Sequence, residues 1–352
     1  MMLWQCEVKK MLLTHKGLWI LLVCLVLKLA FLWVFPEQKD SRILLSQKQY
    51  DKFLLELHGE NTPEKSNWIL SEYESYKQIR DSYQEMQEQY ARGEITEEEW
   101  NTYTQALNQA DLKINSAAIF AEKAEQFLEQ PEDLPPAHYI YEYGWQTVFT
   151  LLRFPDVFLL VAVLLLSAQC FSAEAAGGML PVLLAARRGR RQLFAVKLLA
   201  LLAVCLGGCV LSGWLEWAVF ARRGWLNDGG APLYSVTWMR DCPLELTLEQ
   251  GYGLCLAVRT LAALLFAVMI FGLSVWIRGG ANLIFTGLCL LALPLLWDGP
   301  AALFTYSGLL CGSGMLLWLG QSGMPLAVPL AVTGACSAAA AFFGAKRHDR
   351  GI

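Results

Sequence analysis

Residues 17–35 read GLWILLVCLVLKLAFLWVF, a run of 19 positions whose one charged residue is Lys28. A helix needs about 20 apolar residues to cross a hydrocarbon core about 30 Å thick. Lys9, Lys10 and Lys16 precede the run, and basic residues favour the cytoplasmic side of a membrane. We therefore expect a retained span with its amino end in the cytoplasm, and we expect the Lys28 ammonium to reach for the far interface.

Further apolar runs follow along the chain, and they predict spans at about 148–171, 194–220, 252–277, 281–297 and 324–343. The last of these lies in a tail of 47 consecutive uncharged positions, 299–345, which is long enough for two spans. Two spans there would place the basic carboxyl end outside, against the positive-inside rule. We predict six spans, with 300–323 as a re-entrant outer hairpin before the last helix; seven spans are the alternative.

Composition divides the chain into an acidic part and a basic part. Residues 36–145 carry 22 acidic and 10 basic side chains, a net charge of −12, whereas the rest carries 10 acidic and 18 basic, a net charge of +8. Hydrophobic residues make up 55% and charged residues 17% of the whole, against about 25% charged in soluble proteins. This excludes an ordinary soluble enzyme, and the basic apolar part indicates a membrane protein, not a nucleic-acid binder.

The ten cysteines and four histidines indicate neither disulfides nor a metal site. No cysteine lies in 36–145, and most of the others sit in apolar runs, where a thiol behaves as a small hydrophobe. Cys205 and Cys209 are four residues apart, but no histidine or carboxylate is spaced to complete a metal shell with them. The spans also lack paired Asp or Ser/His constellations, so we expect no catalytic residue and no metal.

Residues 36–145 leave the first span and return to the second, so they should form one domain outside the cell. Thr62 followed by Pro63 predicts a helix start, and Gly93 a left-handed helix end. Thr96 and Glu99 then form the pattern of a capping box. Apolar residues recur every seven positions on both sides of Gly93, which predicts an antiparallel helical hairpin with a coiled-coil seam. The predicted seam comprises Ile69, Tyr76, Tyr83 and Tyr90 on one helix and Trp100, Leu107, Ile114, Ala121 and Leu128 on the other.

The segment between the second and third spans combines one acid, two glycines, a proline and an arginine cluster. It reads CFSAEAAGGMLPVLLAARRGRR over 170–191 and leads to Lys197. Gly178 and Pro181 interrupt the helix where the chain leaves the lipid, and the arginines can meet lipid headgroups. From the residues alone, an arginine-rich topology anchor is the favoured interpretation, ahead of a functional role.

The order of these elements resembles the type 2 family of ATP-binding-cassette (ABC) exporter permeases. The resemblance includes a basic amphipathic amino end, a large outer insert after the first span and a re-entrant piece before the last. It implies that 172–192 is the coupling region that contacts a cytosolic ATPase subunit. The implied coupling residues are Glu174, Gly178, Arg187, Arg188, Arg190, Arg191 and Lys197.

The resemblance also implies that ATP and Mg are bound by a separate subunit. The sequence has no Gly-x-x-x-x-Gly-Lys-Ser/Thr phosphate loop, so we expect no cofactor in this chain. The implied partners are the ATPase, a second permease chain, identical or different, and the lipid membrane, with no nucleic acid. Arg259 and Glu216 are candidates for a substrate pathway, although snorkelling of Arg259 and an interfacial place for Glu216 are alternatives.

The sequence thus predicts an all-α polytopic protein of the plasma membrane with both termini in the cytoplasm. The expected function is that of a permease subunit in an ATP-driven exporter. The alternative is a membrane-anchored sensor or assembly scaffold whose outer coiled coil binds a partner. The expected domains are an interfacial segment 1–16, a first span 17–35, the outer domain 36–145, spans two to six within 146–345 and a tail 346–352.

Overall fold

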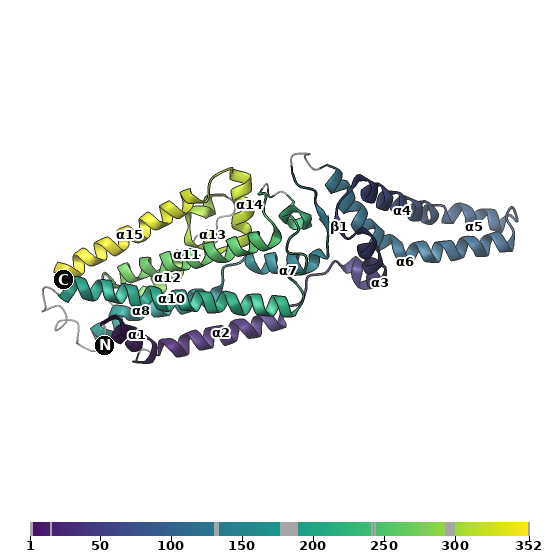
Figure 1. The fold of residues 1–352 in the computed structure, drawn as a ribbon. Coiled ribbons are helices and arrows are strands. Elements are labelled where there is room, and N and C mark those ends of the chain that lie inside the picture. Colours follow the sequence, from purple (N-terminus) through teal and green to yellow (C-terminus); the bar gives the residue numbers. More distant parts are fainter. Residues whose placement is uncertain are drawn as a thin grey trace. The chain divides into compact units, whose positions relative to one another are not determined.

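The computed structural model describes residues 3–14, 16–129, 134–176, 189–240, 242, 244–277, 279–292 and 300–350, without the side chains of 45, 172–176, 189–191, 300 and 350. In these parts the chain is almost entirely helical (Figure 1). It forms two compact units. The first, here the apolar unit, comprises Met1–Pro36, Thr147–Leu226 and Glu249–Ile352; the second, the polar unit, comprises Glu37–Gln146 and Asn227–Leu248.

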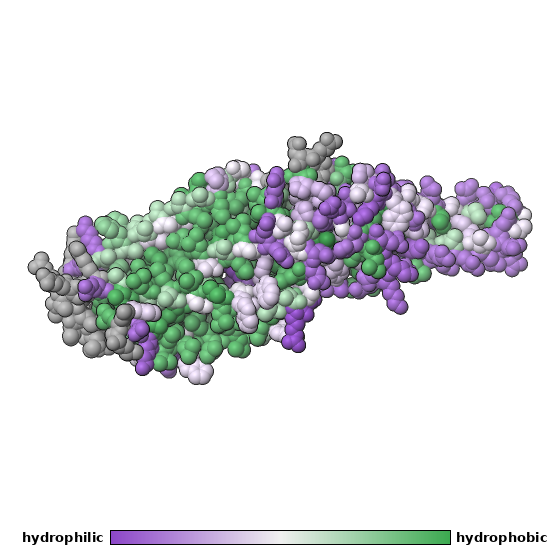
Figure 2. Space-filling view, viewed as in Figure 1, coloured by the Kyte–Doolittle hydropathy of each residue, from purple (hydrophilic) through white to green (hydrophobic). Residues whose placement is uncertain are grey.

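Long apolar helices build the apolar unit, and Figure 2 shows apolar surface over them. Five candidate spans are long and apolar enough to cross a membrane, so this is a membrane-embedded helical protein. They are Gly17–Val34, Glu142–Phe171, Gln192–Arg222, Leu248–Ser274 and Ala327–Asp349. The helices that supply them are α2 (Gly17–Val34), α7 (Glu142–Leu152), α8 (Val157–Ala176), α10 (Gly189–Arg222), α11 (Leu248–Ser274) and α15 (Ala327–Arg350).

Two shorter helical elements lie where the sequence predicted the fifth span and the interfacial amino-terminal segment. The span expected at 281–297 is described as α12 (Gly280–Ala292), 13 residues long, and 293–299 lie outside the described residues. The amino end forms α1 (Leu3–Lys9) followed by a π-helical turn, Lys10–Thr14. Five helices are long enough to span the membrane, and α12 is described over only 13 residues. Six spans therefore stay a prediction.

The second predicted span, 148–171, is interrupted, which corrects the expectation of one continuous helix. Helix α7 ends at Leu152 and α8 begins at Val157. Pro155 lacks an N–H and disfavours helical geometry in the residue before it. Asp156 then starts the new helix, because its Oδ1 accepts a hydrogen bond of 3.0 Å from the backbone N–H of Leu159.

Residues 300–322 form three short helical pieces that lie largely buried in the apolar unit. These are the 3₁₀ turn Pro300–Phe304, α13 (Tyr306–Leu310) and α14 (Gly312–Ser322). Serine hydroxyls tie them to neighbouring helices: Ser307 Oγ donates to Leu291 O at 2.6 Å, and Ser313 Oγ donates to Phe149 O at 2.7 Å. Such bonds satisfy backbone carbonyls where water is scarce. The re-entrant outer hairpin expected at 300–323 stays a prediction.

The polar unit contains an antiparallel helical hairpin, as predicted (Figure 1). Its first arm comprises α4 (Pro63–Asp81) and α5 (Tyr83–Ala91), its second arm is α6 (Glu97–Leu128), and Figure 2 shows the hydrophilic surface that covers it. Helix α3 (Ser41–Leu57) packs against α6 at the base, and a two-stranded antiparallel sheet joins β1 (Gly59–Glu60) to β2 (His138–Tyr139).

The predicted helix ends of the hairpin are confirmed. The Thr62 hydroxyl accepts a hydrogen bond from the third helical residue, with Pro63 at the first position. Gly93 has a φ of 72° and its N–H donates to Tyr90 O at 3.0 Å. The Thr96 backbone N–H donates to Glu99 Oε2 at 2.8 Å, and the Glu99 N–H donates to the threonine hydroxyl, which completes the capping box.

The core of the hairpin lies at its base and includes a helix that the sequence analysis did not place. Tyr50 of α3 stacks on Phe120 of α6 with ring centroids 4.8 Å apart, beside fully buried Ile69 of α4. The predicted seam is incomplete towards both ends: Leu128 at the base is 47% exposed, and Tyr83 and Tyr90 towards the tip are exposed. The seam therefore describes the middle of the hairpin, and a regular coiled coil stays a prediction.

Residues 227–248, expected as part of a loop between the third and fourth spans, belong to the polar unit. The indole N–H of Trp145 donates to Asn227 O at 2.5 Å. The backbone N–H of His138 in β2 donates to Ser235 Oγ at 2.9 Å, and Leu233 N–H donates to Leu246 O at 2.8 Å. The first two bonds attach the segment to β2 and α7 of the polar unit, and the third closes the segment on itself.

Candidate functional site

Four charged side chains meet inside the apolar unit, each from a different helix. Lys28 Nζ lies 2.5 Å from Asp156 Oδ2 and 2.8 Å from Glu216 Oε1, and the second Glu216 oxygen pairs with Arg259. Lys28 comes from α2, Asp156 from the start of α8, Glu216 from α10 and Arg259 from α11. All four are at least nine-tenths buried. We call this group the buried charge cluster.

A serine completes the polar shell of the cluster. Lys28 Nζ donates to Ser212 Oγ, and that hydroxyl donates to Asp156 Oδ2 at 3.3 Å. Ser212 lies four residues before Glu216, so both side chains project from one face of α10. The Asp156 carboxylate thus accepts from Lys28, Ser212 and the first turn of α8, which leaves it well satisfied despite its burial.

The cluster carries two positive and two negative charges and is therefore neutral as a whole. An isolated charge away from water costs several kcal/mol, whereas a set that is paired and hydrogen-bonded avoids most of this cost. Lys28 and Arg259 each lie 11 residues after the first residue of their helices. That is about 16 Å along the axis, or half the thickness of a hydrocarbon core. Ionisable residues at such depth usually mark functional sites.

The structure brings together the two residues that the sequence analysis named as a pathway and adds two more. Arg259 does not extend to an interface but pairs with Glu216, so the snorkelling alternative is wrong. Glu216 is buried although Trp214 and Trp217 beside it are exposed, so its carboxylate faces the other helices of the unit. Lys28 was also expected to snorkel, and it is 4% exposed.

Asp156 was not among the candidate residues that the sequence analysis named. A sum of charges over the spans would not have singled out the cluster, because the predicted spans also contain Arg153 and Lys197. No local sequence pattern links the four residues of the cluster, since they lie far apart in the sequence.

Of the predicted coupling residues, only the side chain of Lys197 is among those that the structure describes. Its Nζ lies 3.0 Å from Glu7 Oε2 and 3.4 Å from Cys170 O, over the ring of Phe171. This buried contact holds α1 and α8 against α10. The side chains of Glu174, Arg190 and Arg191, and all of Gly178, Arg187 and Arg188, lie outside the described residues.

The described ranges contain no group of three or more His, Cys, Asp or Glu side chains placed to hold a metal ion. Comparisons of the chain with protein-family models, curated proteins and solved structures found no match. The resemblance to ABC permeases therefore stays a prediction, and functional inference depends on the buried charge cluster and the elements around it.

Proposed function

We propose that this chain is the membrane-spanning permease subunit of an ATP-driven ABC exporter. It would move its substrate by alternating access, coupled to a separate ATPase subunit. The buried charge cluster is the observation that carries the proposal, because ionisable side chains at membrane depth are expensive and are kept where a polar path or a moving interface needs them.

The pairing inside the cluster suits a bundle whose halves move against each other. Lys28 with Asp156 forms one neutral pair on α2 and α8, and Glu216 with Arg259 forms a second on α10 and α11. The ion pair that joins them is Lys28 with Glu216. A rocking motion between the two helix pairs would break this link without leaving an uncompensated charge in the lipid, which is what an alternating-access transition requires.

The short helices over 300–322 also support the proposal of a permease. Their backbone breaks lie within the apolar unit, and serine hydroxyls satisfy carbonyls there. Non-helical backbone at membrane depth is tolerated where it is covered by protein or lines a polar cavity. We propose that this segment is the re-entrant hairpin of a six-span bundle with both termini in the cytoplasm.

Coupling would occur at 172–192, where Glu174 and the arginine cluster would contact the ATPase that binds ATP and Mg. A second permease chain would complete the pathway, because six spans form half of one and symmetric pairing is the default. In this arrangement Lys197 has an internal role: through Glu7 it would pass movement of the coupling region to α1.

Co-purification tests the proposed coupling. The full chain in detergent should retain a cytosolic ATPase, and Glu174→Lys combined with Arg187→Glu should weaken that complex at least tenfold. Glu85→Lys combined with Arg92→Glu, the same reversals on the hairpin, is the matched control and should retain the ATPase. If the coupling variant binds as well as this control, or if the wild type retains no ATPase, the proposal is wrong.

A topology experiment tests the proposed orientation independently. Single cysteines introduced within 60–130 of a cysteine-free chain should react with a membrane-impermeant maleimide in intact cells. Cysteines introduced at 188–191 should react only after permeabilisation. Labelling of the arginine cluster from outside would contradict both the orientation and the assigned contact with a cytosolic motor.

The alternative function is a membrane-anchored sensor or scaffold that binds a partner through the hairpin. One observation favours it: near the far end of the hairpin, Tyr90 stacks on Trp100 with centroids 5.1 Å apart, and Tyr90 is exposed. Aromatic side chains are enriched in protein interfaces. Under this reading, deletion of 83–100 would abolish partner binding, whereas the coupling variant would change nothing.

A further inference from the structure

A well-defined helix end places two neighbouring arginines at the edge of the apolar unit. After α10, Gly224 adopts a left-handed φ of 71°, and the Trp225 N–H donates to Phe220 O at 3.0 Å. A left-handed glycine followed by such a bond is a Schellman motif, which also brings the two residues of the bond into apolar contact. The two rings lie 5.7 Å apart. Arg222 is therefore the last residue of α10 and Arg223 its cap.

Both arginines meet the end of α2. The Arg223 guanidinium donates to Phe35 O at 2.6 Å and to Trp33 O, two carbonyls that the end of the helix leaves without helical partners. The guanidinium carbons of Arg222 and Arg223 lie 5.7 and 5.8 Å from the centre of the Trp33 ring, a range at which a cation is attracted to an indole. Arg223 thus joins the two helix ends, and Arg222 stands beside the indole.

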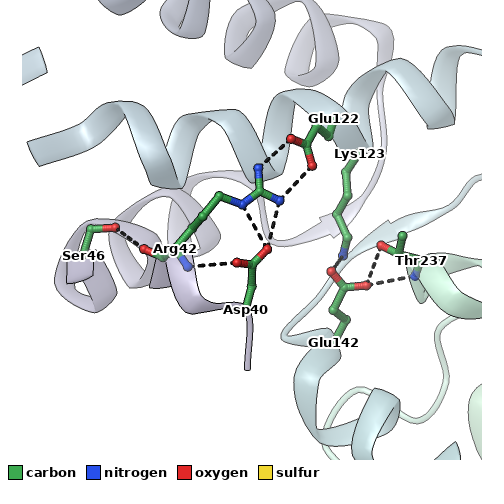
Figure 3. Close-up of polar contacts among 7 residues, drawn as sticks. All are labelled: Asp40, Arg42, Ser46, Glu122, Lys123, Glu142 and Thr237. Carbon is green, nitrogen blue, oxygen red and sulfur yellow. Dashed lines mark hydrogen bonds and ion pairs between the residues drawn. The ribbon is translucent and has the colours of Figure 1, made fainter. Parts of the chain in front are cut away.

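The positive charge of this helix end has no counter-charge in the parts of the chain that the structure describes. Arg223 meets neutral carbonyl groups, and no described acid pairs with Arg222, which is exposed. Arg42 of the polar unit shows the contrast, because its guanidinium pairs with Asp40 and Glu122 (Figure 3). The ends of α2 and α10 each supply a partial charge of about −0.5, so a net charge of about +1 is left for a ligand to compensate.

Exposed apolar side chains lie beside the arginines. Trp33 is 52% exposed and Val34 is 82% exposed, and α2 is the least buried of the five candidate spans. Both α2 and α10 end where the chain passes into the polar unit. The end of a span that carries tryptophan and arginine is typical of the membrane interface, where headgroups meet acyl chains. A free anion would use the arginines but not this apolar surface.

A second copy of the chain matches this surface less well than a lipid does. In a two-fold symmetric pair the same patch meets itself, so the arginines of one copy would approach those of the other. Like charges that face each other across an interface are strongly disfavoured. A phospholipid instead brings a phosphate of opposite charge together with acyl chains that can cover α2.

We propose that the adjoining ends of α2 and α10 bind an anionic phospholipid, whose phosphate meets Arg222 and whose acyl chains lie along Trp33 and the exposed face of α2. A zwitterionic lipid carries its own cation beside the phosphate, so a lipid of net negative charge matches the surplus charge better. Arg223 is a positioning residue, because its guanidinium is used on the α2 carbonyls. The inference needs only the membrane location of the apolar unit and does not depend on the transport proposal.

Lipid retention by the full-length chain tests the proposal. The chain is equilibrated in micelles that contain equal amounts of phosphatidylglycerol and phosphatidylcholine, and native mass spectrometry counts the lipids that each chain retains. The wild type should retain phosphatidylglycerol at least fivefold over phosphatidylcholine. That ratio corresponds to about 1 kcal/mol, which is what one basic residue contributes at an anionic surface. Equal retention of the two lipids would overturn the proposal.

Matched variants place the lipid at this helix end. Arg222→Gln removes the proposed contact and should retain one phosphatidylglycerol fewer per chain than the wild type, whereas Arg222→Lys keeps the charge and should retain the same number. Arg80→Gln, the same change at an exposed position on α4, is the control and should match the wild type. Because Arg222 is exposed, the fold should persist in these variants. Equal retention by Arg222→Gln and the control would contradict the site.

Two further measurements separate a lipid from other partners. Millimolar inorganic phosphate should leave the bound phosphatidylglycerol in place, because a free anion lacks acyl chains; displacement would show a site for an anion alone and would refute the proposal. Size-exclusion chromatography should give the same oligomeric state for the wild type and Arg222→Gln. A changed oligomeric state with unchanged lipid retention would assign the surface to a second copy of the chain, against the proposal.

Discussion

Lys28 Nζ lies 2.5 Å from Asp156 Oδ2, although 128 positions separate the two residues in the sequence. The pair joins α2 to the start of α8 inside the apolar unit. Asp156 has a second role at the same place, because its other oxygen caps α8. A charge pair and a helix start therefore depend on one carboxylate.

Loss of Lys28 alone should destabilise the apolar unit strongly. Lys28→Met leaves three charges with a net charge of −1, and breaking a buried pair costs about 3–5 kcal/mol. Lys28→Met combined with Asp156→Asn removes one pair as a unit and keeps a capping side chain at 156, so it should recover most of the loss. Thermal unfolding in detergent, followed by size-exclusion chromatography, measures both. A half-exposed control, Lys77→Met, whose side chain is 44% exposed, should change stability by less than about 0.5 kcal/mol. If Lys28→Met behaves like it, the cluster is not as described.

Close packing of α15 on α11 should make Gly272 intolerant of any side chain. A Cβ at this position would lie 2.5 Å from the backbone C and O of Ala340. Gly272→Ala should therefore cost about 1–3 kcal/mol through overpacking. Gly253 lies in the same helix with open space around it, so Gly253→Ala should be neutral or stabilising by about 0.4–1 kcal/mol. Comparison of the two thermal midpoints in one detergent tests this, and equal midpoints would contradict the close approach.

Asp40 should contribute a pH-dependent part to the stability of the polar unit. Its pKa is lowered, first by the hydrogen bond from the Arg42 side chain. A lowered pKa in the folded state adds stability above the ordinary value of about 3.9, and that stability is lost as the pH falls through the folded-state pKa.

Asp40→Asn keeps a side chain that can cap α3 but removes the charge. The wild type should therefore unfold at a higher temperature than Asp40→Asn at pH 7, with the gap closing towards pH 3. Asp40→Ala should cost a further 0.5–2 kcal/mol or so at every pH, because the cap is also lost. A gap that stays constant with pH would show that ionisation of Asp40 is not involved.

The contact between Glu7 and Lys197 should control how firmly α1 is held. Glu7→Gln weakens a charge-assisted bond worth about 1.5–3 kcal/mol, so amide hydrogen exchange over 3–14 should accelerate about tenfold or more. Lys9→Gln, at an exposed position two residues away, is the control and should leave exchange unchanged. Similar exchange in both variants would indicate that other contacts hold α1.

Local features of the fold were predictable from the sequence. Thr62, Gly93 and the pair Thr96 and Glu99 marked helix ends correctly, because caps depend on neighbouring residues only. Helix α3 was missed, although Ile43, Tyr50 and Leu57 recur at the seven-residue spacing that revealed the rest of the hairpin. The signal was present but not used.

The buried charge cluster was not predictable in the same way. A hydropathy analysis considers each charged residue separately. Taken singly, Lys28, Glu216 and Arg259 can each be explained by snorkelling or by a place at the interface. Their pairing depends on how the helices pack, which no local pattern records. The interruption at Asp156 was missed, although Pro155 marks it: a proline lacks an N–H and disfavours helical geometry in the residue before it.

The separation between Lys28 and its partners also has a consequence for biogenesis. At about 5–20 residues per second, the ribosome reaches position 156 about 6–26 s after position 28, and Glu216 and Arg259 follow later still. During that interval α2 enters the bilayer carrying an ammonium with no counter-ion. The nascent helix must then sit shifted towards one headgroup layer, or shelter beside the insertion machinery, until α8 arrives and draws it to its final depth.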